Sequence, residues 1–198
     1  MLSRIKARFE RTLTPLIKVL PKSPNLLTIS SLLVTLPTPI LLILFGLNIL
    51  PLIILLIVIA SLLDVLDGIC ARSLGRTTRL GSFLDSTIDR YVDFIILLNF
   101  VIITSFNINI LILIFFSLMG SLMTSYVRAK AESLQLSLSG VGIFERSERI
   151  IYLIITLIIF TITHNHFLIF IMLLIFAIIT NATAIERILK VIKRLKRE

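Results

Sequence analysis

Six long apolar segments divide the sequence, each close to the about 20 residues that a helix needs to cross a bilayer. They cover residues 25–46, 51–72, 81–103, 109–131, 145–163 and 167–187. With 57% hydrophobic residues and a mean hydropathy of +1.06, the chain lies outside the composition of soluble globular proteins. Because a helix satisfies its own backbone hydrogen bonds in hydrocarbon, the segments predict an all-α integral membrane protein with six transmembrane helices.

The charged residues indicate which ends of the segments share a side of the membrane. If the N-terminus is cytoplasmic, the inner regions are residues 1–25, 64–93, 126–149 and 186–198. They contain all 20 Lys and Arg residues and all 11 Asp and Glu residues. The outer turns are residues 46–51, 104–109 and 161–167, and they contain neither kind. Because basic residues remain on the cytoplasmic side, we expect both termini and the active chemistry at the cytoplasmic face of the cell membrane.

Three parts are expected along the chain. Residues 1–24 mix Lys and Arg with apolar residues, are too polar to span, and predict an interfacial amphipathic helix. Residues 25–187 would form the six-helix membrane domain, and residues 188–198 a basic cytoplasmic tail. The net charge of +9 is concentrated at the termini and segment ends, without interleaved aromatic residues. This distribution favours an anionic bilayer surface as the partner over nucleic acid.

Four aspartates interrupt the apolar sequence around the second and third segments: Asp64, Asp67, Asp85 and Asp89. An ionised carboxylate in hydrocarbon is costly, so their presence indicates a function. Asp64 and Asp67 are three residues apart and Asp85 and Asp89 are four apart, and each spacing places a pair on one helical face. Two such faces turned toward each other would surround one point with carboxylate oxygens. Mg²⁺ and Mn²⁺ prefer such ligands and usually also hold substrate phosphates.

The residues between the acids extend this interpretation. Gly68 and Gly81 would let a ligand approach the backbone, and Arg72 would suit a phosphate oxygen. The whole stretch reads D-x-x-D-G-x-x-A-R-x₈-G-x-x-x-D-x-x-x-D from Asp64 to Asp89. This pattern resembles the signature of the CDP-alcohol phosphotransferases, also called CDP-alcohol phosphatidyltransferases, with every specified position filled.

The resemblance implies a lipid donor, either CDP-diacylglycerol or CDP-archaeol, with CMP as the leaving group, and a homodimer. It implies a metal site of Asp64, Asp67, Asp85 and Asp89, with Asp89 also accepting the proton of the attacking hydroxyl. Residues implied to bind the CDP-lipid are Asn25, Thr28, Asp64, Asp67, Gly68, Ala71, Arg72, Thr78 and Gly81. For Asn25 and Thr28, an N-cap at the start of the first segment is an equally open interpretation.

A second polar group lies at the inner ends of the fourth and fifth segments. It consists of the runs Ser125-Tyr-Val-Arg128-Ala-Lys130-Ala-Glu132 and Glu145-Arg146-Ser-Glu148-Arg149. By residue type alone, these are either helix-end charges that orient the segments or a cationic pocket for a phosphorylated acceptor. The runs resemble those of phosphatidylinositol phosphate and archaetidylinositol phosphate synthases. That resemblance implies an inositol phosphate acceptor bound by Ser125, Arg128, Lys130, Arg146 and Arg149.

The expected function is therefore divalent-metal-dependent transfer of a phosphatidyl-type group from a CDP-lipid to a polar acceptor. Glycerol 3-phosphate, serine or another inositol substrate in place of inositol phosphate stays open, as do ester-linked and ether-linked donors. Intramembrane prenyltransferases are a rival class, but they lack the Gly-x-x-Ala-Arg run and need more than six spans. A cation transporter would place its acids near mid-membrane instead of at one face.

Overall fold

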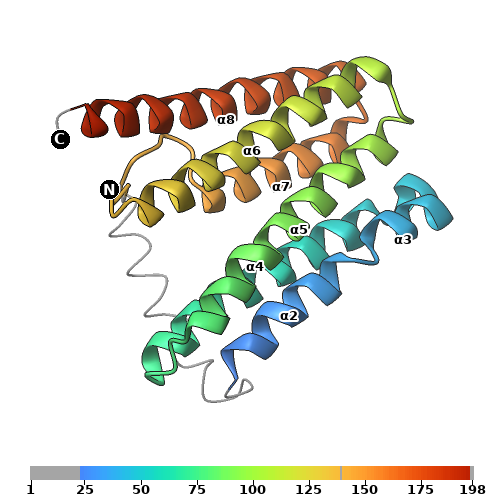
Figure 1. The fold of residues 1–198 in the computed structure, drawn as a ribbon. Coiled ribbons are helices and arrows are strands. Elements are labelled where there is room, and N and C mark those ends of the chain that lie inside the picture. The colour runs from blue at the N-terminus through green and yellow to red at the C-terminus, as the bar shows by residue number, and fades with distance from the viewer. Residues whose placement is uncertain (1–22, 139, 197–198) are drawn as a thin grey trace. The chain divides into compact units, whose positions relative to one another are not determined.

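The structure is a computed structural model that describes residues 23–138 and 140–196. All regular secondary structure in these residues is helical (Figure 1). The helices are α2 (Pro24–Thr35), α3 (Thr38–Phe45), the short 3₁₀ helix η2 (Gly46–Ile49), α4 (Leu50–Ser73), α5 (Arg79–Ile103), α6 (Ile108–Ser133), α7 (Arg146–Thr163) and α8 (His166–Leu195). The interfacial helix expected at residues 1–24 falls almost wholly outside the described residues.

Proline and glycine divide the first apolar segment. Helix α2 begins at Pro24, where a missing N–H costs nothing, and ends at Thr35. Pro37 cannot continue the helix because it has no N–H and its ring crowds the preceding turn. The first apolar segment is therefore divided into α2, which ends at Thr35, and α3, which begins at Thr38. Gly46 then adopts a φ of +69°, a conformation that favours glycine, where the chain turns into η2 and α4.

Two asparagines cap the starts of α6 and α8. The Asn107 side chain accepts hydrogen bonds from the N–H groups of Asn109 and Ile110 at the start of α6. The Asn165 side chain does the same for Phe167 and Leu168 at the start of α8. Each cap satisfies N–H groups that have no partner within the helix. Turns therefore lie within the expected ranges 104–109 and 161–167, between α5 and α6 and between α7 and α8.

The chain divides into two compact units. The first comprises residues up to Thr38 together with Leu55–Ile95, and the second comprises Pro39–Ile54 and Ile96–Glu198. In the first unit, α2 packs on α4 through a buried cluster of Leu27, Leu66 and Cys70, with Leu63 against it. Cys70 is thus a small packing residue of this core.

In the second unit, α6 and α8 run alongside each other at very close range (Figure 1). A Cβ added at Gly120 would lie 2.8 Å from the Thr180 hydroxyl and 2.9 Å from the Asn181 backbone nitrogen. Asn181 also donates to the Phe116 carbonyl across this contact, at 2.9 Å. Glycine at position 120 is therefore required by the close approach of the α6 and α8 backbones.

Helix α7 contacts α8 as well, where the Tyr152 hydroxyl donates to the Met172 carbonyl at 2.9 Å.

Helix α8 continues beyond residue 187, where the sixth segment was expected to end. Ile188 and Val191 pack against a buried cluster of Val127, Ala131, Leu138 and Val141. These contacts stabilise an additional two turns, so the expected basic tail at 188–198 starts as helix. Lys190 and Glu186 reinforce the same stretch with an i, i+4 ion pair at 2.6 Å.

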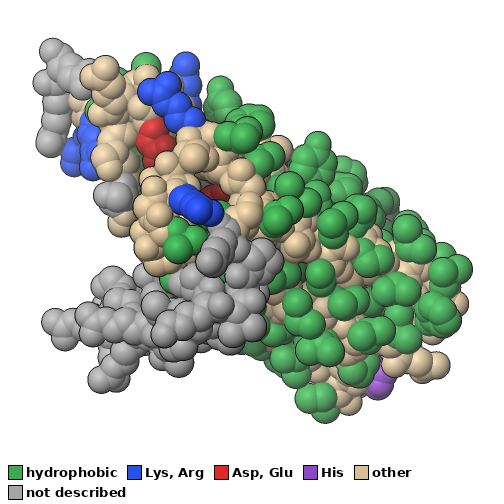
Figure 2. Space-filling view, turned by 90° about the horizontal axis from the view of Figure 1, so that it is seen from below, with side chains coloured by type: hydrophobic (Ala, Val, Ile, Leu, Met, Phe, Trp, Pro, Cys, Tyr) green, Lys and Arg blue, Asp and Glu red, His purple; other side chains and the backbone are tan. Residues whose placement is uncertain are grey.

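Three helical stretches of the described chain are long and apolar enough to cross a membrane: Pro24–Ser73, Ile108–Ser133 and His166–Leu195. The first is 50 residues long and contains α2, α3, η2 and α4. Figure 2 shows hydrophobic side chains over a broad area of the visible face. An all-helical, membrane-embedded protein follows from these helices.

Candidate metal centre and candidate acceptor site

Three of the four predicted aspartates converge in the first unit. One carboxylate oxygen from each of Asp64, Asp67 and Asp85 lies within 4.8 Å of the other two. Asp67 is 5% exposed, and the other two are half-buried. Two oxygens bound to one Mg²⁺ at about 2.1 Å lie about 3–4 Å apart, so small side-chain rotations would bring the three to ligand distances. The donor set therefore fits a hard divalent cation.

Asp89 lies one helical turn beyond Asp85 on α5 and is 8% exposed. Among the described residues, the group of acids close enough to share a cation consists of Asp64, Asp67 and Asp85, without Asp89. The i, i+4 spacing nevertheless places Asp89 on the same face of α5 as Asp85. Its expected role as a proton acceptor beside the metal remains a prediction.

Thr28 connects α2 to this centre. Its hydroxyl donates a hydrogen bond to Oδ2 of Asp67, and its side chain is 3% exposed. The N-cap interpretation of Asn25 and Thr28 is wrong, because α2 already begins at Pro24, with Ser23 in the capping position. Pro24 thus occupies the first position of the helix, and the Thr28 hydroxyl points at Asp67 on α4.

Asn25 and Thr78 meet at Gly81. A Cβ at Gly81 would lie 3.0 Å from Asn25 Oδ1 and 3.1 Å from Thr78 Oγ1. The Thr78 hydroxyl accepts a hydrogen bond from the Gly81 N–H at 3.0 Å, so it caps the first turn of α5. Glycine at position 81 allows the start of α5 to approach the start of α2 closely.

The space over Gly68 is filled by the chain itself. A Cβ at Gly68 would lie 3.2 Å from a terminal nitrogen of Arg72, one turn further along α4. Glycine therefore lets the Arg72 guanidinium fold back along the helix, where the sequence analysis expected room for a ligand. Ala71, the other small residue of the motif, is half-buried on the same helix.

The predicted acceptor residues lie in the second unit, at the end of α6 and the start of α7. Arg128 is exposed and donates to Glu132 at 2.9 Å. Arg149 is 3% exposed. Glu145 and Glu148 form a capping box on the first turn of α7. The two glutamates of the second run are thus used to begin the helix, which explains their spacing without a ligand.

Ser125, Lys130 and Arg146 occupy less distinctive positions. The Ser125 hydroxyl donates to the Ser121 carbonyl at 3.2 Å within α6. Lys130 is exposed in the last turn of α6, and Arg146 is half-buried in the first turn of α7. Their expected contacts with an acceptor phosphate remain predictions.

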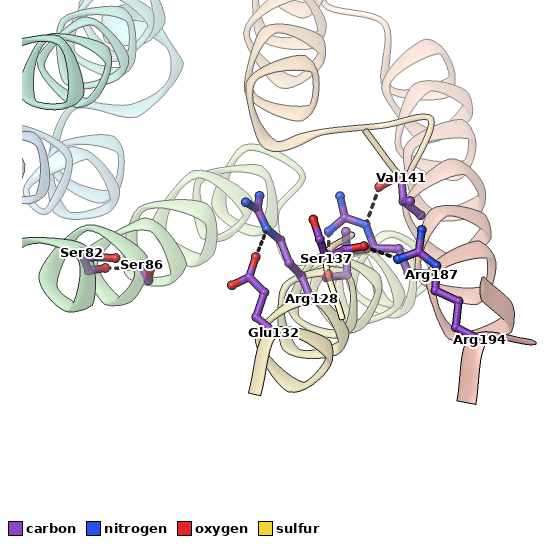
Figure 3. A network of polar contacts seen from close by, with 9 residues as sticks. Ser82, Ser86, Arg128, Glu132, Ser137, Val141, Arg187 and Arg194 are labelled. Atoms are coloured by element: carbon purple, nitrogen blue, oxygen red, sulfur yellow. Dashed lines mark hydrogen bonds and ion pairs between the residues drawn. The ribbon is translucent and has the colours of Figure 1, made fainter. Parts of the chain in front are cut away.

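Arg187 is the residue that the sequence analysis missed. It is 6% exposed and donates from Nε to the Val141 carbonyl at 2.9 Å and from Nη1 to the Thr124 carbonyl at 2.8 Å (Figure 3). Arg128 and Arg149 are among its electrostatic neighbours, as are Glu145 and Glu186. Its position at the end of an apolar segment could have indicated a buried role. Several basic residues follow it closely, however, so the sequence does not distinguish Arg187 from them.

This chain resembles known proteins in sequence and in fold. The archaetidylinositol phosphate synthase of Pyrococcus horikoshii is 33% identical over 201 residues, which cover 99% of each chain. That of Methanothermobacter thermautotrophicus is 46% identical over 95 residues, 48% of this chain and 47% of the relative. A crystal structure of Mycobacterium tuberculosis phosphatidylinositol phosphate synthase with CDP-DAG bound superposes with a TM-score of 0.71 at 24% identity, covering 95% of this chain and 94% of that one.

The same Mycobacterium tuberculosis enzyme has also been solved in complex with manganese and citrate, and it superposes with a TM-score of 0.71 at 23% identity over 94% of this chain and 88% of that one. These likenesses establish the fold. The family model described as CDP-alcohol phosphatidyltransferase matches residues 22–185, which include α2 to α7 and most of α8. With a full-length relative of 33% identity beside that match, this chain belongs to the CDP-alcohol phosphatidyltransferase family and is an enzyme of that family.

Proposed function

We propose that this enzyme transfers a phosphatidyl-type group from a CDP-lipid to a hydroxyl of inositol phosphate and releases CMP. The observation that carries the proposal is the convergence of Asp64, Asp67 and Asp85, in a family whose donors contain a diphosphate. The name of the full-length relative, archaetidylinositol phosphate synthase, supports inositol phosphate as the acceptor. Both CDP-diacylglycerol and CDP-archaeol fit the apolar helices, since the two donors differ only in their tails.

Asp64, Asp67 and Asp85 would hold Mg²⁺ or Mn²⁺ beside the donor diphosphate. When bound, the cation neutralises the charge that develops on the departing phosphate. Asp89 would accept the proton of the acceptor hydroxyl. The hydroxyl oxygen forms a bond to the phosphorus next to the lipid glycerol. The bond from that phosphorus to the bridging oxygen breaks, and CMP leaves with its electron pair.

The nucleotide part of the donor would bind around the starts of α2 and α5 and the end of α4. We assign it to Asn25, Thr28, Gly68, Ala71, Arg72, Thr78 and Gly81, in addition to Asp64 and Asp67. The close approach of Asn25 and Thr78 at Gly81 supports this assignment, since it gathers polar groups within the unit that holds the aspartates. The Arg72 side chain would rotate away from Gly68 so that its guanidinium contacts a phosphate oxygen.

The acceptor phosphate would bind to Arg128, Arg146 and Arg149, with Ser125 and Lys130 nearby. A phosphate monoester carries nearly two negative charges, which several guanidinium groups match better than they match free inositol or serine. Arg187 adds a further buried cation beside Arg128 and Arg149. Glu132 would release Arg128 when the phosphate arrives, at little cost, because exposed ion pairs contribute little stability.

We further propose six spans, with α2 and α3 as the first, both termini and the active site on the cytoplasmic side, and a homodimer. The domain boundaries stay at residues 1–24, 25–187 and 188–198. Asn109→Cys and His166→Cys would then react with an impermeant reagent from outside, whereas Arg76→Cys and Ser133→Cys would not, all in a Cys70→Ala background. All four positions are exposed. External labelling at Arg76→Cys would contradict this topology.

The function is tested with purified protein, a CDP-lipid and Mg²⁺ or Mn²⁺, following CMP release with a series of acceptors. We expect inositol phosphate to support the fastest release, ahead of glycerol 3-phosphate, serine and free inositol. Release should cease in excess chelator. A preference for another alcohol would overturn the acceptor assignment alone, whereas release that persists without divalent cation would overturn the metal site.

A further inference from the structure

Thr28 and Asp67 form a buried hydrogen bond between α2 and α4, 39 residues apart in the chain. Their side chains are 3% and 5% exposed. We propose that Thr28 is a positioning residue: its hydroxyl fixes the Asp67 carboxylate so that the other oxygen faces the metal site. This inference rests on the proposed metal site and differs from the nucleotide contact that the family resemblance implies for Thr28.

The direction of the hydrogen bond follows from the two acceptors around the Thr28 hydroxyl. Oδ2 of Asp67 is the nearer one, and the Pro24 carbonyl, four residues back in α2, is 3.2 Å away. A hydroxyl has one proton, and a carboxylate is the stronger acceptor. The equivalent contacts of Thr124 and Thr180 to their own helices are shorter, at 2.7 and 2.8 Å. The long contact at Thr28 is consistent with a proton that points at Asp67.

The other buried hydroxyls of α2 donate to carbonyls of their own helix. Ser31 donates to the Thr28 carbonyl at 2.7 Å, and Thr35 donates to the Ser31 carbonyl. Both bonds stay within the helix, as serine and threonine hydroxyls commonly do. Thr35 is fully buried on the same helix, so it is a matched control for Thr28.

The consequence for the metal site is orientational. A carboxylate turns easily about its last bond, and a metal ligand that is free to turn loses that freedom when the ion binds. Hydrogen bonds to the non-ligating side of a ligand remove this cost and typically change metal affinity 10–100-fold. Thr28 would thereby act on the metal through Asp67, and this role is separate from its assigned contact with the nucleotide.

The test compares Thr28→Val, Thr28→Ser and Thr35→Val by titrating the purified proteins with Mn²⁺ in the absence of substrate, using the paramagnetic resonance signal of free Mn²⁺. We expect Thr28→Val to weaken Mn²⁺ binding about 10–100-fold. Thr28→Ser, which keeps the hydroxyl, and Thr35→Val should both bind Mn²⁺ with the affinity of the wild type. In the CMP-release assay, Thr28→Val should need more Mn²⁺ for half-maximal rate and recover most of that rate at saturation.

Wild-type Mn²⁺ affinity in Thr28→Val, together with a raised KM for the CDP-lipid, would overturn the positioning role and favour the nucleotide contact. If the wild type itself binds no Mn²⁺, the metal site fails and the positioning role fails with it. Thermal unfolding without metal controls for folding. If Thr28→Val does not fold, Thr28→Ala is compared with Thr28→Ser in the same titration.

Discussion

The aspartate group and the arginine group differ in how their charged side chains are held. Asp67 is buried and accepts a hydrogen bond from Thr28, and one carboxylate oxygen of each of its partners Asp64 and Asp85 lies within 4.8 Å of one of its own. Arg128 is exposed and ion-paired to Glu132 one turn away. Glu145 and Glu186 lie close to Arg187 in the same region.

We infer from this difference that the proposed metal site is largely preorganised, whereas the proposed acceptor site has to exchange ion-pair partners. Carboxylates held in place before a cation arrives cost little to reorganise when it binds. An arginine paired to a nearby glutamate has to leave it, and the exchange depends on the charge of the incoming ligand. Changes in the aspartate group should therefore affect the chemical step, and changes in the arginine group should affect acceptor binding.

The largest effect is expected from Asp64→Asn or Asp85→Asn. A metal ion stabilises transition-state charge by several kcal/mol, so loss of one ligand should lower kcat for CMP release by about three orders of magnitude. Mn²⁺ titration should show weakened binding in the same proteins. Asp93→Asn is the control, since Asp93 is a buried acid on the same helix, paired with Arg90 at 3.8 Å and outside the metal group. An equal loss in Asp93→Asn would indicate a general effect of buried charge on α5.

The next effect sharpens the comparison from the arginine side. Arg128→Ala should raise the acceptor KM by about 10–100-fold, because a hydrogen bond to a charged group is worth about 1.5–3 kcal/mol. The KM for the CDP-lipid should stay within about twofold, since the donor is held by other groups. Lys190→Ala is the matched control, because Lys190 and Glu186 form an ion pair of the same i, i+4 spacing on α8. Equal changes in donor and acceptor KM would remove the distinction between the two sites.

The smallest effect tests whether Arg187 shapes the acceptor region. Gly142 has a φ of +120°, and a Cβ there would lie 2.9 Å from Thr183 and 3.1 Å from Nε of Arg187. Gly142→Ala should displace Arg187 from the Val141 carbonyl, lower the melting temperature and raise the acceptor KM several-fold, with Mn²⁺ binding unchanged. Gly140→Ala is the control, because Gly140 also has positive φ, +71°, but a Cβ added there would meet nothing within 4 Å. It should carry only the backbone strain, about 1 kcal/mol. Equal acceptor KM values in the two variants would separate Arg187 from acceptor binding.

Most of the helix pattern was readable from the sequence. Apolar segments of about 20 residues, broken by Pro37, Gly46, Asn107 and Asn165, place the helix ends within a few residues of where they lie. The reason is that proline and glycine act locally, and a helix in hydrocarbon is determined by its own composition. The extension of α8 to Leu195 was not readable, because it depends on packing of Ile188 and Val191 against α6 and its loop.

The aspartate centre was predicted because its information is local too. Spacings of three and four residues place each pair on one face, and the resemblance to a known signature supplied the rest. The convergence of Asp67 and Asp85 required only that α4 and α5 pack side by side. Which of the acids lie closest to one another depends on the tertiary structure, and these are Asp64, Asp67 and Asp85.

The sequence by itself determined a helical membrane protein with an acidic centre, since composition, spacing and helix-breaking residues act over one or two turns. Only the tertiary structure decided that Thr28 holds Asp67, that Arg72 covers Gly68, and that Arg187 joins the loop at Val141 to the α6 carbonyl of Thr124. Two of these contacts join residues 39 or more positions apart, and the third depends on a rotamer. A hydroxyl or a guanidinium can donate to many different acceptors, so its partner depends on which acceptor the packing of neighbouring helices brings close. The local sequence does not determine that packing.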